Sequence, residues 1–243
     1  MEKNFEKKYH EIEESHFWFK SRRKYIRDLL LKSPRNARIL DIGCSSGILL
    51  NELRDDGFKT ENLFGVDISE AAIQNCKKND LPNTFVMNGE DIKLEEKFDI
   101  IIASDCLEHI ENDSLALENW FSLLNPNGHI YVFVPAFMSL WSNHDKVNMH
   151  FRRYTLNELT MKLKKANFHI QKNSYWNFML FLPVYLMRKI KKLSPSKNND
   201  SGDLDKIPLA NTFLYHLINT ENKLLSFVNF PIGISAFCIA TKK

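Results

Sequence analysis

The chain has 243 residues, of which 44% are hydrophobic and 26% are charged. These values are ordinary for a globular protein, and the length suits one α/β domain with an insertion. A net charge of +3 gives no argument for a nucleic-acid partner. The widely spaced Cys44, Cys76, Cys106 and Cys238 predict free thiols in a reducing cytoplasm. We expect no secretory signal and no membrane span, since the N-terminus lacks an apolar core and no run of ~18 apolar residues occurs.

Residues 5–31 interleave charged and apolar side chains with a helical period, which predicts a helical cap over residues 1–35. Within it, residues 16–23 place three aromatics beside two arginines. The aromatics either cover the sheet or form a flap over a cofactor, with an arginine available for a carboxylate. Residue chemistry alone favours the first interpretation.

Residues 38–50 indicate a short buried strand, a tight turn of small residues and the first turn of a helix. Such a turn presents backbone N–H groups to a ligand lying across it. About twenty residues later, a second apolar run (63–67) ends on Asp67. In a doubly wound sheet this carboxylate falls beside the first turn, where it can accept hydrogen bonds from ribose hydroxyls.

The following segments alternate between the hydrophobic pattern of a strand and that of a helix. Ser69 is a good N-cap for a helix that ends near Leu81, and a polar turn at 88–91 follows the third strand. The remaining predicted elements are strands at 84–87, 98–103 and 129–134 and a helix at 113–124 that stops at 125–128. This order predicts an α/β fold, a Rossmann-like and mostly parallel sheet with helices on both faces.

The C-terminal part completes the predicted sheet. Thr155 opens a capping box before a helix, residues 169–176 suit a sixth strand, and residues 233–240 suit the last strand. We therefore assign residues 36–176 and 231–243 to the core and residues 177–230 to a helical insertion.

The insertion begins with an apolar run (178–187) followed at once by basic residues (188–192). The run is too short to span a bilayer, but an apolar surface with a basic rim can lie in the membrane interface. A lid or a homodimer helix buried against protein is an equal alternative. The polar residues 194–203 indicate an exposed loop.

The glycine turn speaks against a dinucleotide. Counted from Gly43, the pattern GxGxxG would need glycine where Ser45 and Ile48 stand. Asp-x-Gly-x-x-x-Gly with a carboxylate ending the strand suits a ligand without phosphates. An ammonium group can use the acid, and an adenosine can lie along the turn.

Four motifs in order carry a resemblance: DIGCSSG, GVDIS, FDIIIASDCLEHI and LLNPNGHIYVFVP. Together they resemble class I S-adenosylmethionine-dependent methyltransferases over about residues 36–135. The flanks HFWFKSRR and LWSNHDKVNMHFRRYT resemble small-molecule methyltransferases of bacterial surface-glycan or lipid-linked sugar pathways. The resemblance implies S-adenosylmethionine as cofactor and a seven-stranded sheet whose last strand is antiparallel.

The resemblance also implies cofactor contacts. The glycine motif would contact the methionine moiety and the ribose, and Asp67 would grip the ribose hydroxyls. One acid of the turn after the third strand, with Asp91 favoured over Glu90, would approach the adenine amino group. The implied contacts are Trp18, Arg22, Asp41, Gly43, Ser45, Gly47, Asp67, Ile68, Glu90, Asp91, Asp105 and Leu107.

Methyl transfer to a hydroxyl or an amine requires a base that removes a proton. Polar groups beyond the carboxyl ends of the fourth and fifth strands are the candidates. His144, which has a carboxylate next to it, is favoured as base over His109 and His150. The predicted acceptor-binding residues are Asp145, Arg152, Arg153 and Tyr154. A metal site using Glu108 and the histidines has no support from ligand spacing, so no metal is predicted.

The predicted function is therefore methyl transfer to an oxygen or nitrogen of a small molecule, plausibly a sugar or a lipid-linked glycan precursor. An NAD-dependent oxidoreductase is one alternative. A non-catalytic protein of the same fold that docks on membranes or a partner enzyme is another. The expected location is the cytoplasm, including peripheral contact with the cytoplasmic membrane face through residues 178–192.

Overall fold

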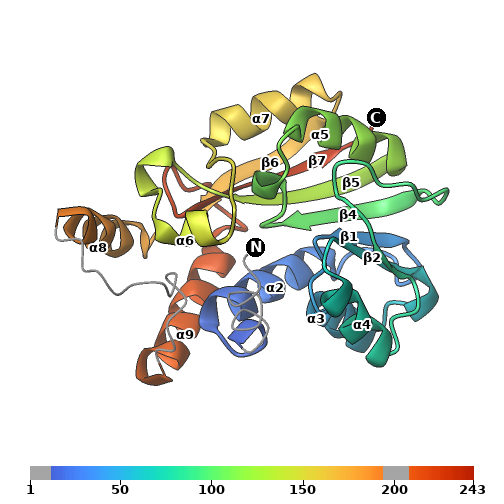
Figure 1. Ribbon diagram of the computed structural model, residues 1–243, viewed down its shortest axis with the longest axis horizontal. Helices are drawn as coiled ribbons and strands as arrows, with labels where there is room; N and C mark the ends of the chain where they lie inside the picture. Colours follow the sequence, from blue (N-terminus) through green and yellow to red (C-terminus); the bar gives the residue numbers. More distant parts are fainter. Residues whose placement is uncertain (1–11, 194–207) are drawn as a thin grey trace.

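A computed structural model describes residues 12–193 and 208–243, so the polar run expected at 194–203 lies outside the described residues. Its centre is a seven-stranded sheet with the order β3-β2-β1-β4-β5-β7-β6 (Figure 1). The strands are β1 (Ile39–Ile42), β2 (Leu63–Asp67), β3 (Thr84–Val86), β4 (Phe98–Ser104), β5 (Leu124–Pro135), β6 (His169–Trp176) and β7 (Ser235–Thr241). β7 runs antiparallel to β5 and β6, and the other pairs are parallel. The predicted Rossmann-like sheet is confirmed.

The order of the strands fixes where a ligand binds. β1 lies between β2 and β4, so Asp41 pairs with Gly65 on one side and with Ile102 on the other. All four residues of β1 are buried, as expected for a central strand covered on both faces. Chain order reverses between β1 and β4, and ligands of open α/β sheets bind at the carboxyl ends of the strands beside such a reversal.

Helices cover both faces of the sheet (Figure 1). Side chains such as Ile42, Ile101 and Val132 pack with α5 and α7, whereas Ile39, Ile102 and Phe133 pack with α2, α3, α4 and α9. Successive strand residues therefore feed two separate cores. The helices are α2 (Phe17–Leu30), α3 (Ile48–Asp55), α4 (Glu70–Lys78), α5 (Asp113–Leu123), α6 (Asn143–Val147), α7 (Leu156–Lys165), α8 (Phe181–Leu193) and α9 (Pro208–Leu224), with short 3-10 turns η1 (Thr60–Asn62), η2 (Leu107–His109) and η3 (Met138–Leu140).

Two element boundaries differ from the predictions. The continuous helix expected over residues 5–31 is wrong in its described part, because the chain leaves the helix at residues 14–16 and α2 starts anew. The His16 side chain caps this new start by accepting from the Trp18 N–H. The fifth strand begins at Leu124, ahead of the predicted 129, because Leu124 pairs with Phe98 across an irregularity in the ladder. Residues 5–11 lie outside the described part.

α9, within residues 177–230, holds α2 against the sheet. Asn222 accepts from the indole N–H of Trp176 at 2.7 Å and donates to the Ser21 carbonyl at 3.2 Å. One side chain of α9 thus joins β6 to α2. Glu221, the preceding residue, accepts from the backbone N–H groups of Phe178 and Met179, each at 3.0 Å, and so fixes the start of α8.

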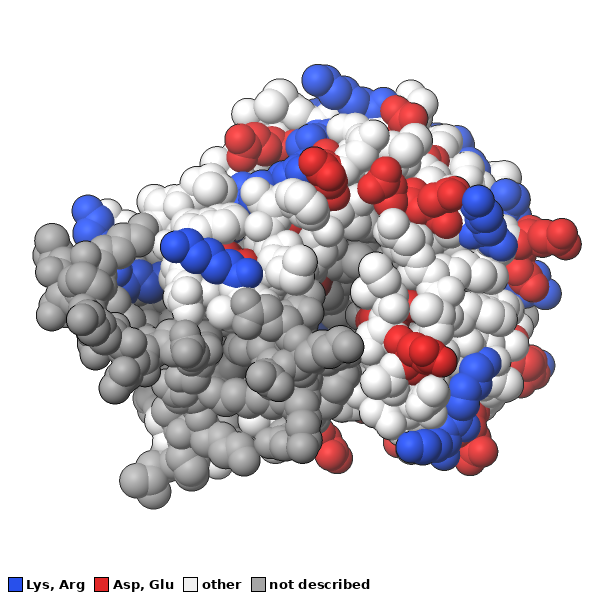
Figure 2. Space-filling view, viewed as in Figure 1, with Lys and Arg blue, Asp and Glu red and all other residues white. Residues whose placement is uncertain are grey.

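Charges of both signs are intermingled over the described part of the face in Figure 2. The four cysteines are free, as predicted. Among residues 12–193 and 208–243, no helix combines the length and the apolar character needed to cross a bilayer.

We predict that Asn222→Ala lowers the free energy of unfolding by about 1–3 kcal/mol, because the buried Trp176 N–H loses its acceptor. Urea unfolding followed by tryptophan fluorescence measures the change. Thr220→Ala is the matched control, since the exposed Thr220 hydroxyl donates to the His216 carbonyl within its own helix. Equal losses in the two variants would contradict the bridging role of Asn222.

Candidate active site

The turn after β1 has the backbone that its small residues allow. Gly43 and Gly47 have φ values of +76° and +75°, and Ser45 between them has +48°. A Cβ on Gly43 would lie 3.1 Å from the Cβ of Cys106, and one on Gly47 would lie 2.6 Å from a Leu81 methyl group. Both glycines are therefore required by backbone conformation and by close packing.

Asp67, at the end of β2, holds this turn in place. Its carboxylate accepts from the backbone N–H of Ser45 at 2.9 Å and from that of Ser69 at 2.8 Å. The Val66 carbonyl accepts from the N–H groups of Gly43 and Cys44. The turn and the start of α4 thus form one unit at the carboxyl ends of β1 and β2.

A cavity opens beside the turn, with the buried Asp41 in its wall. It is lined by Glu13, Phe19, Arg22, Arg23, Ile26, Asp41, Gly43, Cys44, Leu49, Ser104 and Asp105. Burial, and then the charges of Glu13 and Asp67, raise the pKa of Asp41 to about 8. The cavity therefore has an acidic wall that favours a cationic ligand.

α2 reaches this cavity through Arg22, which is 2% exposed. The guanidinium donates to Asp105 at 3.3 Å and to the Ser235 hydroxyl at 2.8 Å, and it lies 4.1 Å from the centre of the Trp176 ring. The aromatics of the N-terminal segment also cover the sheet: Trp18 contacts Trp176 edge to face at 5.2 Å. These contacts agree with the first interpretation, in which the aromatics cover the sheet, and the flap over a cofactor stays a prediction.

The other predicted contacts lie around the same edge. Asp105 follows β4 with φ +53°, and its N–H donates to the Phe133 carbonyl. Glu90 is half-buried, whereas Asp91 is exposed and pairs with Lys93 at 3.1 Å. Among the remaining two, Ile68 is 77% exposed, and Leu107 belongs to the core under α5.

The three candidate histidines come together beyond β4 and β5. The ring centres of His109 and His150 are 4.6 Å apart, and those of His144 and His150 are 6.2 Å apart. The N–H of Phe151 donates to the Glu108 carbonyl at 2.9 Å, which ties the loop after β5 to η2. Burial, and then the charge of His150, lower the pKa of His109 to about 3, so this ring is neutral at physiological pH.

Asp145 and Arg153 form a buried ion pair within that loop. Arg153 donates to Asp145 from Nε at 2.7 Å and from NH2 at 3.1 Å, and the His150 Nδ1 lies 2.9 Å from the same carboxylate. Burial acts to raise the pKa of Asp145, but the hydrogen bonds of His150 and Arg153 outweigh it and hold the pKa well below its usual range. Both residues, predicted to bind the acceptor, thus position the histidines.

Arg152 and Tyr154 turn away from Arg153. Arg152 pairs with Asp113 at 2.8 Å, and the Tyr154 hydroxyl donates to the same Asp113 carboxylate at 2.9 Å. Lys162 pairs with the same Asp113 at 2.7 Å. The four predicted acceptor-binding residues are therefore divided between two internal networks, which favours positioning roles for them.

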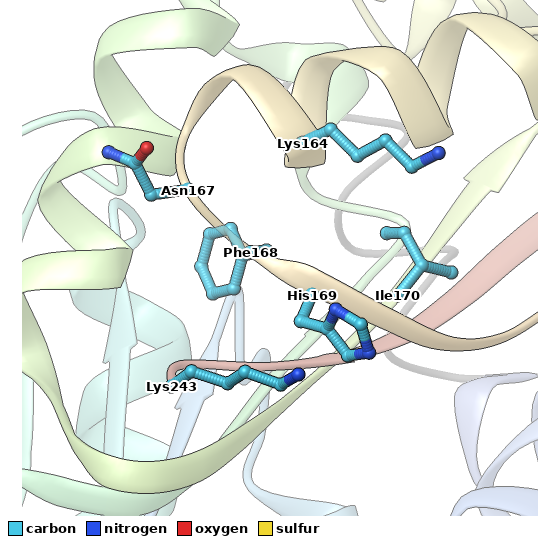
Figure 3. A pocket seen from close by; sticks show the side chains of 6 residues that line it. All are labelled: Lys164, Asn167, Phe168, His169, Ile170 and Lys243. Atoms are coloured by element: carbon cyan, nitrogen blue, oxygen red, sulfur yellow. The ribbon is translucent and has the colours of Figure 1, made fainter.

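Two residues join the site without a signal in the sequence, and Glu108, considered above only as a metal ligand, joins it as well. Glu13 accepts from the Ser45 hydroxyl at 2.9 Å, and Ser104 lies 3.5 Å from Arg22. Glu108 is fully buried beside the histidines. A surface hollow of about 500 Å³ lies far from these groups, where β6 starts and β7 ends; Figure 3 shows its lining, Lys164, Asn167, Phe168, His169, Ile170 and Lys243. It is at the amino ends of the parallel strands, so it is no part of this site.

Comparison with known proteins agrees with this geometry. The profile of a family described as "Methyltransferase domain" matches residues 15–173. The chain belongs to this methyltransferase family. Its cofactor is S-adenosylmethionine, and the site fits that group: two glycines that cannot carry a side chain form a cradle beside the buried Asp41.

Individual relatives are similar over part of the chain. The ubiquinone biosynthesis O-methyltransferase of Pasteurella multocida is 29% identical over 110 residues, which are 39% of this chain and 44% of that protein. The trans-aconitate 2-methyltransferase of Deinococcus radiodurans is 27% identical over 139 residues, 56% of this chain and 51% of that protein. The chain thus matches about half the length of these curated relatives. A SAM-dependent methyltransferase from Archaeoglobus fulgidus has the same fold, with a TM-score of 0.61, 19% identity and 96% and 99% of the two chains covered.

We predict that cofactor binding releases a proton from Asp41 at pH 7. In the free protein the pKa of about 8 keeps this group protonated, and a ligand ammonium beside it favours the ionised form. Calorimetric titration with S-adenosylmethionine in phosphate and in Tris should then give different binding enthalpies. Asp41→Asn should remove the difference, and equal wild-type enthalpies in the two buffers would contradict the prediction.

Proposed function

We propose that this methyltransferase transfers a methyl group from S-adenosylmethionine to an oxygen or nitrogen of a small molecule. The observation that carries the proposal is the gathering of His109, His144 and His150 at the carboxyl ends of β4 and β5, beside the acidic cavity. The cofactor supplies an electrophilic methyl carbon. The acceptor atom bonds to that carbon, the carbon–sulfur bond breaks with its electron pair going to sulfur, and a base takes the acceptor proton.

The contacts of the three rings favour His144 as that base. The lowered pKa of His109 makes this ring a poor proton acceptor near neutral pH. The Nδ1 of His150 is engaged by Asp145, and its Nε2 faces Glu108 at 4.0 Å. His144 lies on α6, next to Asp145 in sequence and 6.2 Å from the His150 ring. The side-chain amide nitrogen of Asn148 lies 3.3 Å from its Nε2, and an amide N–H there suits a neutral ring that accepts protons.

The chemistry of the relatives supports a small acceptor. One similar protein is named for O-methylation in ubiquinone biosynthesis and another for methylation of trans-aconitate. Neither name concerns nucleic acid, and family membership argues against the oxidoreductase alternative. We extend the proposal to a sugar or lipid-linked acceptor, for which the surface of α8 provides support.

α8 has an exposed apolar side, and it lies next to the loop after β5 that carries His144 and His150. Leu182, Leu186 and Ile190 are 61%, 50% and 66% exposed. Arg188 of the same helix is buried and donates to the Leu140 carbonyl, and Phe181 lies 5.8 Å from Phe137. Because α8 is attached to the loop that carries the histidines, a membrane in contact with its apolar side would place a lipid-linked acceptor close to the site. A homodimer contact or a lid is the competing role of this surface.

We predict that His144→Ala lowers kcat about 100-fold or more while the Kd for S-adenosylmethionine stays unchanged. The assay follows S-adenosylhomocysteine released with a panel of phenols, carboxylic acids and sugars. Exposed His216, on α9, provides the matched control, His216→Ala. Asp67→Ala should weaken cofactor binding instead, because the turn loses its anchor. Wild-type protein that does not bind the cofactor would refute the proposed function; an unchanged kcat in His144→Ala would refute only the choice of base.

We predict that the protein sediments with vesicles that contain anionic lipid and that Leu182→Glu with Ile190→Glu lowers the bound fraction about tenfold or more. Leu115→Glu is the control, since Leu115 is 46% exposed on the opposite layer. A wild-type protein that stays in the supernatant contradicts the membrane role. If the double variant then changes the protein from dimer to monomer in light scattering, the surface is a subunit interface.

A further inference from the structure

Three potential metal-ligand atoms lie close together where η2 meets the loop after β5. They belong to Glu108, His109 and His150. One atom of each residue, a carboxylate oxygen or a ring nitrogen, lies within 4.8 Å of the other two. Glu108 and His109 are neighbours in η2, whereas His150 arrives from the loop after α6. The sequence separation of about forty residues explains why ligand spacing gave no signal for such a group.

The environment of Glu108 favours a bound cation. Its side chain is fully buried, and neither carboxylate oxygen has a hydrogen-bond partner among the described residues. The two nearby arginines are engaged elsewhere: Arg22 binds Asp105 and Ser235, and Arg153 binds Asp145 and the Ala136 carbonyl. A buried carboxylate in this state is costly unless a cation or a proton neutralises it.

The two histidines are already oriented as metal ligands are. His150 directs Nδ1 to Asp145 at 2.9 Å, which leaves Nε2 facing Glu108 at 4.0 Å. The Asp145 carboxylate is itself fixed by Arg153. The backbone of Asn148 lies beside the His109 ring. Ligating histidines usually place their second nitrogen on a carboxylate or a backbone carbonyl, and His150 has the first of these arrangements.

We propose that Glu108, His109 and His150 bind a divalent transition-metal ion. Two imidazoles and one carboxylate suit Zn²⁺, Mn²⁺, Co²⁺ or Fe²⁺ better than Ca²⁺ or Mg²⁺. Ligand atoms around a tetrahedral ion at 2.0–2.2 Å are about 3.4 Å apart, so small side-chain rotations from the present 4.0 Å and 4.8 Å suffice. Three protein ligands leave an open coordination position.

The role of this ion rests on the proposed function. An acceptor oxygen in the open position would lie on the side of His144, whose ring is 6.2 Å from that of His150. The ion would favour the deprotonated oxygen, His144 would take the proton, and the oxygen would then attack the methyl carbon. Metal binding itself is independent of this step and can be measured without an acceptor.

The test uses tag-free, full-length protein stripped with EDTA and dialysed. Titration with ZnCl₂ and with MnCl₂ in a calorimeter should show one site per chain, and CoCl₂ should give visible d–d absorption bands. Glu108→Gln keeps the shape but removes the charged ligand, so we expect the metal Kd to rise about 10- to 100-fold or more. His150→Ala should behave alike, and His169→Ala, at the far edge of the sheet, is the histidine control.

Each outcome decides the proposal. One site in the wild type that Glu108→Gln and His150→Ala weaken, while His169→Ala retains it, supports the metal site. No binding by the wild type, or equal binding by Glu108→Gln, overturns it and leaves Glu108 as a buried neutral acid. Calorimetry with S-adenosylmethionine on the same samples separates the two proposals, since failure to bind the cofactor refutes the function and leaves the metal result standing.

Discussion

The acceptor side of this protein depends on the buried carboxylate of Asp145. Five groups meet it: two N–H groups of Arg153, the His150 ring, and the backbone N–H and hydroxyl of Ser142. Without them, burial would drive the carboxyl to its neutral form; with them, its pKa falls below the usual range. Removing one partner of such a buried pair costs about 3–5 kcal/mol, because the other charge is left uncompensated. The loop that carries the histidines is therefore held by one electrostatic centre, and His150 has its orientation from it.

The fold was predictable from local patterns, because short apolar runs and capped helices alternate along the chain. Ser69 and Thr155 cap α4 and α7 as their chemistry predicts. The break before α2 was not predictable from period alone, since a histidine acts as its N-cap. The early start of β5 was also not predicted, because Asn125 and Pro126 are turn residues by composition, whereas β5 runs through them from Leu124, which pairs with Phe98.

The site, too, has a part that was predictable from the sequence and a part that was not. The glycine turn and Asp67 follow from sequence, since backbone conformation requires those residue types at that spacing. The assembly of the histidines does not, because it depends on a loop whose turning points are Phe137 and Met149, at φ +57° and +59°. Bulky residues rarely adopt this conformation, so nothing in the sequence announces the turns. Tertiary contacts such as the Phe151 N–H to the Glu108 carbonyl impose them. The support of α2 by α9 is similarly hidden, since Ser21 and Asn222 are about two hundred residues apart.

Charge gives the strongest link between this structure and its chemistry. Glu13, Asp41, Asp67 and Asp105 converge around the cavity, and Glu108 lies just beyond it. Arg22 offsets part of this charge through Asp105. Burial is the main cause of the raised pKa of Asp41, and the negative charges of Glu13 and Asp67 raise it further. S-adenosylmethionine carries a sulfonium and an ammonium, and methyl transfer turns the sulfonium into a neutral thioether. The acidic wall therefore attracts S-adenosylmethionine more strongly than the demethylated product. The same electrostatic field thus favours cofactor binding before the reaction and lowers the affinity for the product after it.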